Sequence, residues 1–517
     1  MKITPTGIEN HFDRLIKVAR NERWVERLWE KDATLWSQDP VTQKAIKHRL
    51  GWLDTKQWMV QHQKRIELFS ASARKQFKHV VILGMGGSSL CSDVFSHIFK
   101  MKFQDPKLFI LDSTDPYTIR GLENQIDLQS TLFIVASKSG TTLEVEALRR
   151  YFEAKVTNKS QFISITDPHT PLANSLNKNE GYLDTFLNAP DIGGRFSALS
   201  YFGFVPAACM GVPVNTIMDN AITMINQCHL TSIEDNPGFL LGIFLGASYL
   251  SNKNKLTLLQ SATFNPLGIW IEQLIAESTG KNGLGILPIV DEPQLTEADY
   301  SFDRIFVASN TSLDHLSKHH PTFETTIDSV TGLGGLFFQW QIATAVSGII
   351  LEINPFNEPN VNQSKDNTRS LLDSEEELRF ANIEAKVKAV SSPLNTMESF
   401  LKGIKSPEYL GILAYLEPSE TNQAKLRKFA LKYKVPFSIG FGPRFLHSTG
   451  QFHKGGPNQG RFIQLTCSND PLPIPGFKFG FETLKLTQAL GDFEAMKSLN
   501  RNIINIHLKS HDLSDFS

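Results

Sequence analysis

The chain has 517 residues, of which 41% are hydrophobic and 20% charged, the composition of a globular protein long enough for about three domains. Its 52 Lys and Arg residues nearly balance 53 Asp and Glu residues, which leaves a formal net charge of −1. Nucleic-acid binders and polybasic membrane-surface proteins carry a basic excess, so we expect no nucleic-acid partner and no membrane partner.

Two further features concern location. The most apolar stretches, 239–250 and 342–351, are shorter than the roughly 20 residues that span a bilayer and predict buried helices. The first 20 residues lack the apolar core of a signal peptide. The four cysteines have neither metal-site nor disulfide spacing (Cys91, Cys209, Cys228 and Cys467). We expect reduced core thiols, no metal and a cytoplasmic protein.

Along the chain, residues 1–75 predict an N-terminal helical segment, because WVERLWEKDATLW and KRIELFSASARKQF place apolar residues three to four apart. From His79 the pattern changes to short β-branched runs (HVVILG, LFILDS, TLFIVAS and QFISITD) separated by helical segments. Strands that alternate with helices predict a parallel sheet covered on both faces, here over residues 76–215.

A second alternating block covers residues 216–380. It has predicted strands at 256–262, 284–290, 304–310 and 323–329 and predicted helices at 266–277 and 334–352. A third, smaller α/β domain is predicted at 381–517, where YLGILAYL and VPFSIGF flank an amphipathic helix and a further helix precedes a short final strand. The predicted fold is therefore α/β, with two tandem parallel-sheet domains, an N-terminal helical segment and a C-terminal α/β domain.

Two loops that follow predicted strands have the composition of phosphate-binding loops. GMGGSS (84–89) lets the backbone approach a ligand closely, and SKSGTT (137–142) places four hydroxyl residues before a predicted helix, whose N-terminus attracts anions. Each loop alone could instead be a tight turn or a helix N-cap, with Glu144 completing the second cap. Because both lie at strand ends of one open α/β sheet, together they predict a site for a phosphorylated ligand.

Two further segments carry candidate catalytic side chains. In DIGGRFS (191–197), two glycines precede Arg195 and allow it to reach a cleft, although a surface arginine is the alternative. Gln273 and Glu277 are four residues apart and share one helix face. Glu277 lies where that helix is predicted to end, and the negative end of the helix would raise its pKa slightly, as suits a general base. A solvated glutamate is the alternative.

Taken together, GMGGSS, SKSGTT, GGRFS, ESTGK (277–281) and NPFNEPNVNQSK (354–365) resemble, in order and spacing, the glucose-6-phosphate isomerase family. The N-terminal LWEKDATLW and RLGWLD and the C-terminal GPRFLHSTGQFHKGGPNQGRF are more similar to one branch, the isomerase half of fused transaldolase–phosphoglucose isomerase proteins. A transaldolase barrel needs about 250 residues, so the chain resembles that half standing alone.

The resemblance implies two tandem SIS (sugar isomerase) domains, a phosphosugar as the small-molecule partner, and interconversion of glucose 6-phosphate and fructose 6-phosphate in glycolysis and gluconeogenesis. It also implies no cofactor, a homodimer and a functional link to a transaldolase. By the same resemblance, the phosphate would be held by Ser137, Lys138, Ser139 and Thr142, and the sugar would face Gly87, Ser88 and Gln273. Glu277 would be the base of a cis-enediol mechanism, Arg195 would stabilise the negative oxygen, and Lys365 would assist ring opening.

The match departs from the family at two positions. The usual catalytic histidine falls near Leu336, where this chain has none, and the candidates to open the sugar ring are His447 and His453. We predict His453, with a loop that packs the third domain as the alternative. Glu358 stands where many members have glutamine, so it is expected to turn away from the phosphate or to pair with a cation such as Lys365.

Two other functions compete with this interpretation. A non-catalytic SIS-domain sensor of sugar phosphates needs the phosphate loops but neither Glu277 beside Gln273 nor the GGRFS segment, and the presence of both favours an enzyme. An isomerase of a related phosphosugar, such as mannose 6-phosphate, stays open because the contacts that distinguish the configuration at C2 are not assigned by the sequence.

Overall fold

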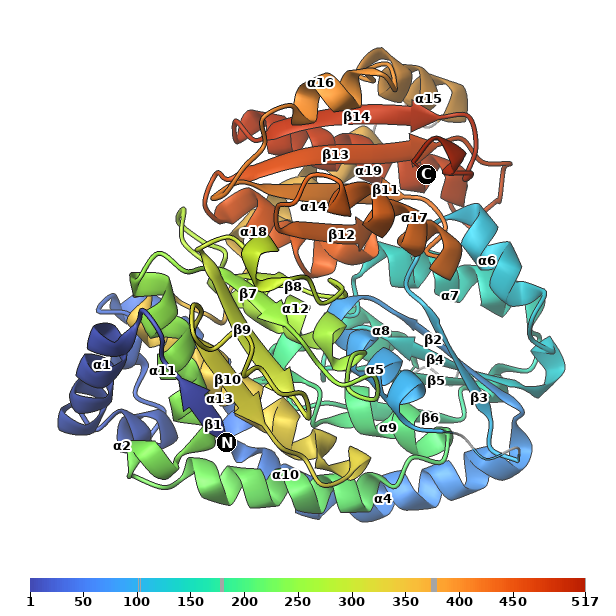
Figure 1. Ribbon diagram of the computed structural model, residues 1–517. Coiled ribbons are helices and arrows are strands. Elements are labelled where there is room, and N and C mark those ends of the chain that lie inside the picture. Colours follow the sequence, from blue (N-terminus) through green and yellow to red (C-terminus); the bar gives the residue numbers. More distant parts are fainter. Residues whose placement is uncertain (101, 103, 177–180, 373–378, 517) are drawn as a thin grey trace.

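The computed structural model describes the chain apart from residues 101, 103, 177–180, 373–378 and 517, and apart from the side chains of 175, 176, 361–365 and 515. Figure 1 shows two sheets with their helices side by side and a third α/β unit packed over one end of both. This arrangement confirms the predicted fold class.

The N-terminal segment consists of α1 (Glu9–Asn21), α2 (Trp24–Trp29), α3 (Pro40–Lys47) and α4 (Thr55–Gln76). As its periodicity predicts, α1 buries Phe12, Leu15 and Ala19 on one face. Strand β1 (Lys2–Thr4), which is too short to be predicted from the sequence, pairs antiparallel with β10 and forms one edge of the second sheet. The segment is therefore built into the second domain rather than appended to it.

The first sheet is entirely parallel, with the strand order β3-β2-β4-β5-β6. The four predicted strands are β2 (His79–Gly84), β3 (Lys107–Leu111), β4 (Thr131–Ala136) and β5 (Phe162–Thr166), and β6 (Asp184–Leu187) was missed. The helices of this region are α5 (Leu90–Ile98), α6 (Pro116–Glu123), α7 (Leu143–Lys155), α8 (Pro171–Leu176) and α9 (Tyr201–Cys209). Every residue of β4 is buried, because helices cover both faces of the sheet.

The second sheet has the order β1-β10-β9-β7-β8 and contains β7 (Lys255–Leu258), β8 (Leu287–Ile289), β9 (Arg304–Ser309) and β10 (Thr322–Thr325). Its helices are α10 (Val214–Cys228), α11 (Pro237–Leu250), α12 (Leu267–Thr279) and α13 (Leu333–Ile350). The stretch Val330–Ile350 is long and apolar enough to cross a membrane, but 94% of its most apolar window is buried inside the fold. The predicted core helices are present, and all four cysteines are unpaired and buried as expected.

The third unit is a parallel sheet with the order β12-β11-β13-β14. Its strands are β11 (Tyr409–Tyr415), β12 (Phe437–Phe441), β13 (Gly460–Cys467), which was missed, and β14 (Asn502–Leu508). Around them lie α14 (Pro359–Leu372), α15 (Phe380–Ala389), α16 (Thr396–Leu401), α17 (Glu420–Leu431), α18 (Gly450–Gly455) and α19 (Phe481–Ser498).

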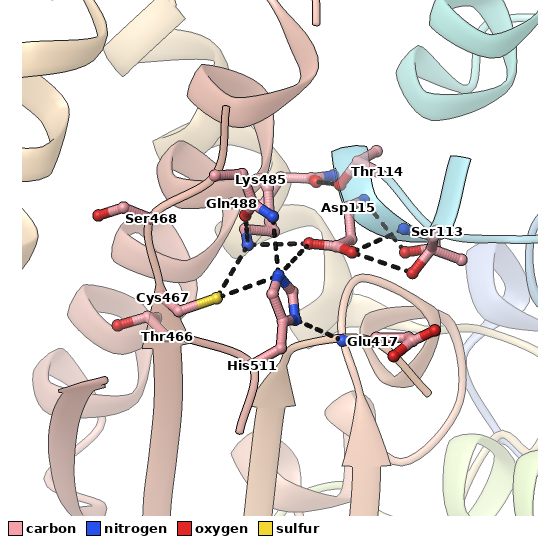
Figure 2. Close-up of polar contacts among 12 residues, drawn as sticks. Ser113, Thr114, Asp115, Glu417, Thr466, Cys467, Ser468, Lys485, Gln488 and His511 are labelled. Carbon is pink, nitrogen blue, oxygen red and sulfur yellow. Dashed lines mark hydrogen bonds and ion pairs between the residues drawn. The ribbon is translucent and has the colours of Figure 1, made fainter. Parts of the chain in front are cut away.

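Helix α19 joins this third unit to the first sheet through buried polar contacts (Figure 2). Lys485 Nζ lies 3.0 Å from Asp115 Oδ1, and both side chains are fully buried. Next to this pair, Thr114 Oγ1 donates a hydrogen bond of 2.8 Å to Gln488 Oε1. Thr114 and Asp115 follow β3, so these contacts fix α19 against the carboxyl end of the first sheet.

Candidate active site

A cavity of about 390 Å³ lies where the carboxyl ends of β2, β4 and β5 face α12. Parallel α/β sheets characteristically bind ligands at this edge. Among the lining residues are the predicted Gly87, Ser88, Lys138, Ser139, Thr142, Arg195, Gln273 and Glu277, together with Arg49, Asp167, Glu358 and His447. The fold thus brings together most of the predicted site residues from segments that are far apart in the sequence.

The glycines of the GMGGSS loop are required by close backbone approaches. A Cβ atom on Gly87 would lie 2.1 Å from the carbonyl oxygen of Gly194, and one on Gly86, whose φ is +53°, would lie 2.8 Å from the carbonyl oxygen of His447. Only glycine accommodates both conditions. Three loops therefore pack backbone against backbone around the cavity.

The hydroxyl-rich loop turns from β4 into α7, as the sequence predicts. Ser137 Oγ accepts a hydrogen bond from the Gly140 N–H and lies 3.0 Å from Thr142 Oγ1, so Ser137 braces the loop and does not itself line the cavity. Ser139 and Thr142 do line it, and Thr142 precedes α7 without capping the helix with its side chain. The N-terminus of a 13-residue helix and these hydroxyls form a suitable anion site.

The ammonium group of Lys138 has two partners within the protein. It forms an ion pair with Asp167 and donates a 2.9 Å hydrogen bond to the carbonyl oxygen of Pro190. Burial raises the pKa of Asp167, and the positive charges of Lys138 and Arg49 oppose that rise. Lys138 thus lines the cavity, but its positive charge is compensated by the ion pair with Asp167.

Arg195 is only 4% exposed and is held on every side. Its Nε donates to Ser278 Oγ at 2.7 Å, and its Nη2 donates to the carbonyl oxygens of Pro355 and Asn357 at 2.7 and 3.0 Å. Its Nη1 faces two carboxylates and lies 3.4 Å from Glu277 Oε1 and 3.1 Å from Glu358 Oε2. A guanidinium held in this way is a fixed positive charge next to the carboxylate predicted to be the base.

Glu277 lies near the end of α12, as predicted, and is 9% exposed. Its Oε2 accepts a 3.1 Å hydrogen bond from Gln273 Nε2, which also donates to the carbonyl oxygen of His447 at 2.7 Å. Burial raises the pKa of Glu277; Glu358 raises it further, while Arg195, His447 and Lys281 oppose the rise. A buried carboxylate with a raised pKa is suited to take up and return a proton.

His447, rather than His453, is the histidine that lines the cavity. His447 Nε2 lies 3.1 Å from Glu144 Oε1, and the same Glu144 oxygen accepts a 2.8 Å hydrogen bond from Gln488 Nε2 of α19. The contacts in Figure 2 continue this network, because Gln488 is also bonded to Thr114. A carboxylate of this kind orients an imidazole for proton transfer.

The prediction for His453 is corrected by its position. The ring is 2% exposed and lies between the aromatic rings of Tyr409 and Phe462, with Nδ1 2.9 Å from Tyr409 Oη. Burial, together with the charges of Lys454 and Arg501, lowers the pKa of His453 to about 3. This is a core histidine, and the ring-opening proposal moves to His447, the other candidate.

Lys365 lies in α14, but its side chain is outside the described residues, so its predicted role stays a proposal. Sequence reasoning missed two other cations. Lys281 of ESTGK is buried, and its Nζ donates to the carbonyl oxygens of Asn354 and Asn357, the latter also an acceptor from Arg195. The second missed cation is Arg49 of the N-terminal segment, for which no spacing signal exists.

The comparisons with known proteins concern the family and the fold. The phosphoglucose isomerase family model matches residues 54–285. A probable glucose-6-phosphate isomerase of Methanococcus maripaludis is 26% identical over 343 residues, covering 56% of this chain and 78% of that protein. A glucose-6-phosphate isomerase of Carboxydothermus hydrogenoformans is 24% identical over 429 residues, covering 68% and 92%.

Two solved structures share the fold. A hypothetical protein from Thermus thermophilus aligns with a TM-score of 0.60 at 20% identity, covering 72% of this chain and all of that one. A glucose-6-phosphate isomerase from Chlamydia trachomatis aligns with a TM-score of 0.54 at 19% identity, covering 70% and 81%. Fold and site together define an α/β protein with tandem parallel-sheet domains and a ligand cavity at the carboxyl ends of the first sheet. The family model and the curated relatives support the glucose-6-phosphate isomerase family as the family of this chain.

Proposed function

We propose that this protein interconverts glucose 6-phosphate and fructose 6-phosphate, with Glu277 moving a proton between C2 and C1 through a cis-enediol. One observation carries the proposal: Glu277 and Arg195 share a cavity with the hydroxyl loop at the N-terminus of α7. The loop would hold the phosphate through Ser139 and Thr142, which leaves the sugar carbons to face α12.

Each step has a residue with suitable chemistry. Glu277, buried and hydrogen-bonded to Gln273, would abstract the proton at one carbon and return it at the next. The enediol develops negative charge on oxygen, which the fixed guanidinium of Arg195 would stabilise without reorganisation. His447, held by Glu144, would transfer the proton that opens the cyclic sugar, and Lys365 remains a proposed assistant in that step.

Glu277 beside Arg195 favours this enzyme over a non-catalytic sensor, because binding alone needs no buried base. We retain a homodimer, a cytoplasmic location, a role in glycolysis and gluconeogenesis, and a link to a transaldolase as proposals that follow from the resemblance.

A coupled assay with glucose 6-phosphate and fructose 6-phosphate tests the function, run with and without a chelator. We expect turnover in both directions that the chelator does not change. Absence of turnover while the protein still binds the sugar phosphates would favour the sensor. Faster turnover of mannose 6-phosphate would favour the related isomerase.

A further inference from the structure

The N-terminal segment contributes one side chain to the cavity, the guanidinium of Arg49. The match to the phosphoglucose isomerase family model begins at residue 54, so Arg49 lies just outside the matched residues. The position of Arg49 in the cavity therefore needs its own physical explanation.

Arg49 reaches the cavity because the chain around it is anchored to the loop that carries Arg195. Leu50 forms an antiparallel bridge with Ile192, and the Gly51 N–H donates a 3.1 Å hydrogen bond to the carbonyl oxygen of Asp191. A Cβ atom on Gly51 would lie 2.2 Å from the Asp191 carboxyl carbon, so a larger residue here would displace the Asp191 side chain.

The next residue completes the anchor. Trp52 is fully buried and packs on Phe196, with ring centroids 5.1 Å apart. Phe196 directly follows Arg195, so Arg49 and Arg195 are held by the same rigid contact between the N-terminal segment and the GGRFS loop. These contacts fix the backbone from which the Arg49 side chain extends into the cavity.

The other two basic side chains of the cavity have protein partners. Lys138 is paired with Asp167, and Arg195 is bonded to Ser278, to two carbonyl oxygens and to Glu358. Among the described residues that line the cavity, Arg49 is the arginine or lysine whose side chain has no hydrogen bond or ion pair within the protein. A partly buried guanidinium left in this state is available to an anion.

The local charges make such a cation necessary. Three carboxylates, Asp167, Glu277 and Glu358, line the same cavity and would repel a phosphate dianion. Although burial raises the pKa of Glu358, Arg195 and Arg49 lower it below its usual value, so this carboxylate is charged at neutral pH. Lys138 and Arg195 are paired with these same carboxylates, so without Arg49 the lysines and arginines of the lining would be outnumbered by its carboxylates.

We propose that Arg49 is a substrate-binding residue that receives the phosphate group of the phosphosugar together with the hydroxyl loop of residues 137–142. The proposal rests on the function proposed above for its ligand class. It assigns the N-terminal segment a role in binding beyond its packing on the second domain.

The test measures binding directly, so that it does not depend on turnover. Calorimetric titrations with inorganic phosphate and with sorbitol 6-phosphate compare the parent protein with Arg49→Gln, Arg49→Lys and a matched control, Arg14→Gln, an exposed arginine of α1. We expect Arg49→Gln to raise both dissociation constants about 10- to 100-fold, Arg49→Lys to raise them less, and Arg14→Gln to leave them unchanged. In the isomerase assay, KM should rise by a similar factor while kcat stays within about threefold.

Unchanged phosphate affinity in Arg49→Gln, with the circular dichroism spectrum and Tm of the parent, would overturn the proposal. So would a parent protein that binds neither probe. If Arg49→Gln does not fold, Arg49→Lys is used for the test, because it keeps the charge and loses the bidentate geometry. An affinity of Arg49→Lys for both probes equal to that of the parent would then contradict the inference. A parent that binds sorbitol 6-phosphate through Arg49 but turns over no sugar phosphate would refute the proposed isomerase alone.

Discussion

The carboxylates of Glu358 and Glu277 both lie against Arg195 Nη1, so the effect of Glu358→Gln on the pKa of Glu277 can be calculated from their separation. The carboxylate oxygens lie 3.1 and 3.4 Å from Arg195 Nη1, so they are at most about 6.5 Å apart. Two unit charges at that distance interact by about 2.5 kcal/mol at an effective dielectric constant of 20, which corresponds to about two pH units. Glu358 is 34% exposed, and solvent screening reduces the expected effect to about one unit.

The sign follows from the role of the base. Glu358 raises the pKa of Glu277, and Glu277 must be ionised to abstract a proton. Removing the Glu358 charge lowers that pKa, so the acid limb of the kcat/KM profile should move about one unit to lower pH in Glu358→Gln. Glu494→Gln, which removes an exposed charge on α19, is the matched control and should leave the limb in place. An unchanged or upward-shifted acid limb in Glu358→Gln would refute the reasoning.

Three further predictions use other measurements. His447→Gln should slow turnover of the cyclic sugar phosphate by about 10²-fold or more and affect turnover of an open-chain analogue much less. His453→Asn should lower Tm and leave the ratio of the two turnover rates unchanged. Equal slowing of both substrates by His447→Gln would point to a packing role for His447. Thr142→Val should raise the KM for glucose 6-phosphate about 10- to 100-fold through the lost hydrogen bond, and an unchanged inhibition constant for inorganic phosphate would remove Thr142 from the anion site. Asp115→Asn should cost about 3–5 kcal/mol in urea unfolding because it leaves the buried Lys485 charge without its partner, and a loss below about 1 kcal/mol would contradict this.

The strands of the first sheet could be predicted because burial on both faces requires continuous β-branched runs such as HVVILG and TLFIVA. The missed strands lack that signal. β6 is a four-residue edge strand, and β13 (GRFIQLTC) carries Arg461 and Gln464 within its length. The side chain of Gln464 is satisfied by a hydrogen bond to the carbonyl oxygen of Ala489, a long-range contact that no local pattern indicates.

The same distinction applies to the site. Glu277, Gln273 and the two loops were predictable because helix spacing and strand ends place them locally. His447 and His453 are six residues apart, His453 lies in the short helix α18, and only the packing of Tyr409 and Phe462 decides that His453 is a core residue. Arg49 could not be predicted, because a bridge between Leu50 and Ile192 joins segments more than 100 residues apart.

The most direct test of the central claim is proton exchange at the sugar carbons in Glu277→Gln. Deuterium uptake from solvent at C1 of fructose 6-phosphate and at C2 of glucose 6-phosphate reports the abstraction step alone, by NMR. Exchange and isomerisation should both fall by about 10³-fold or more, while the dissociation constant for sorbitol 6-phosphate stays within about threefold of the parent value. Exchange near the parent rate in this variant would mean that another group abstracts the proton.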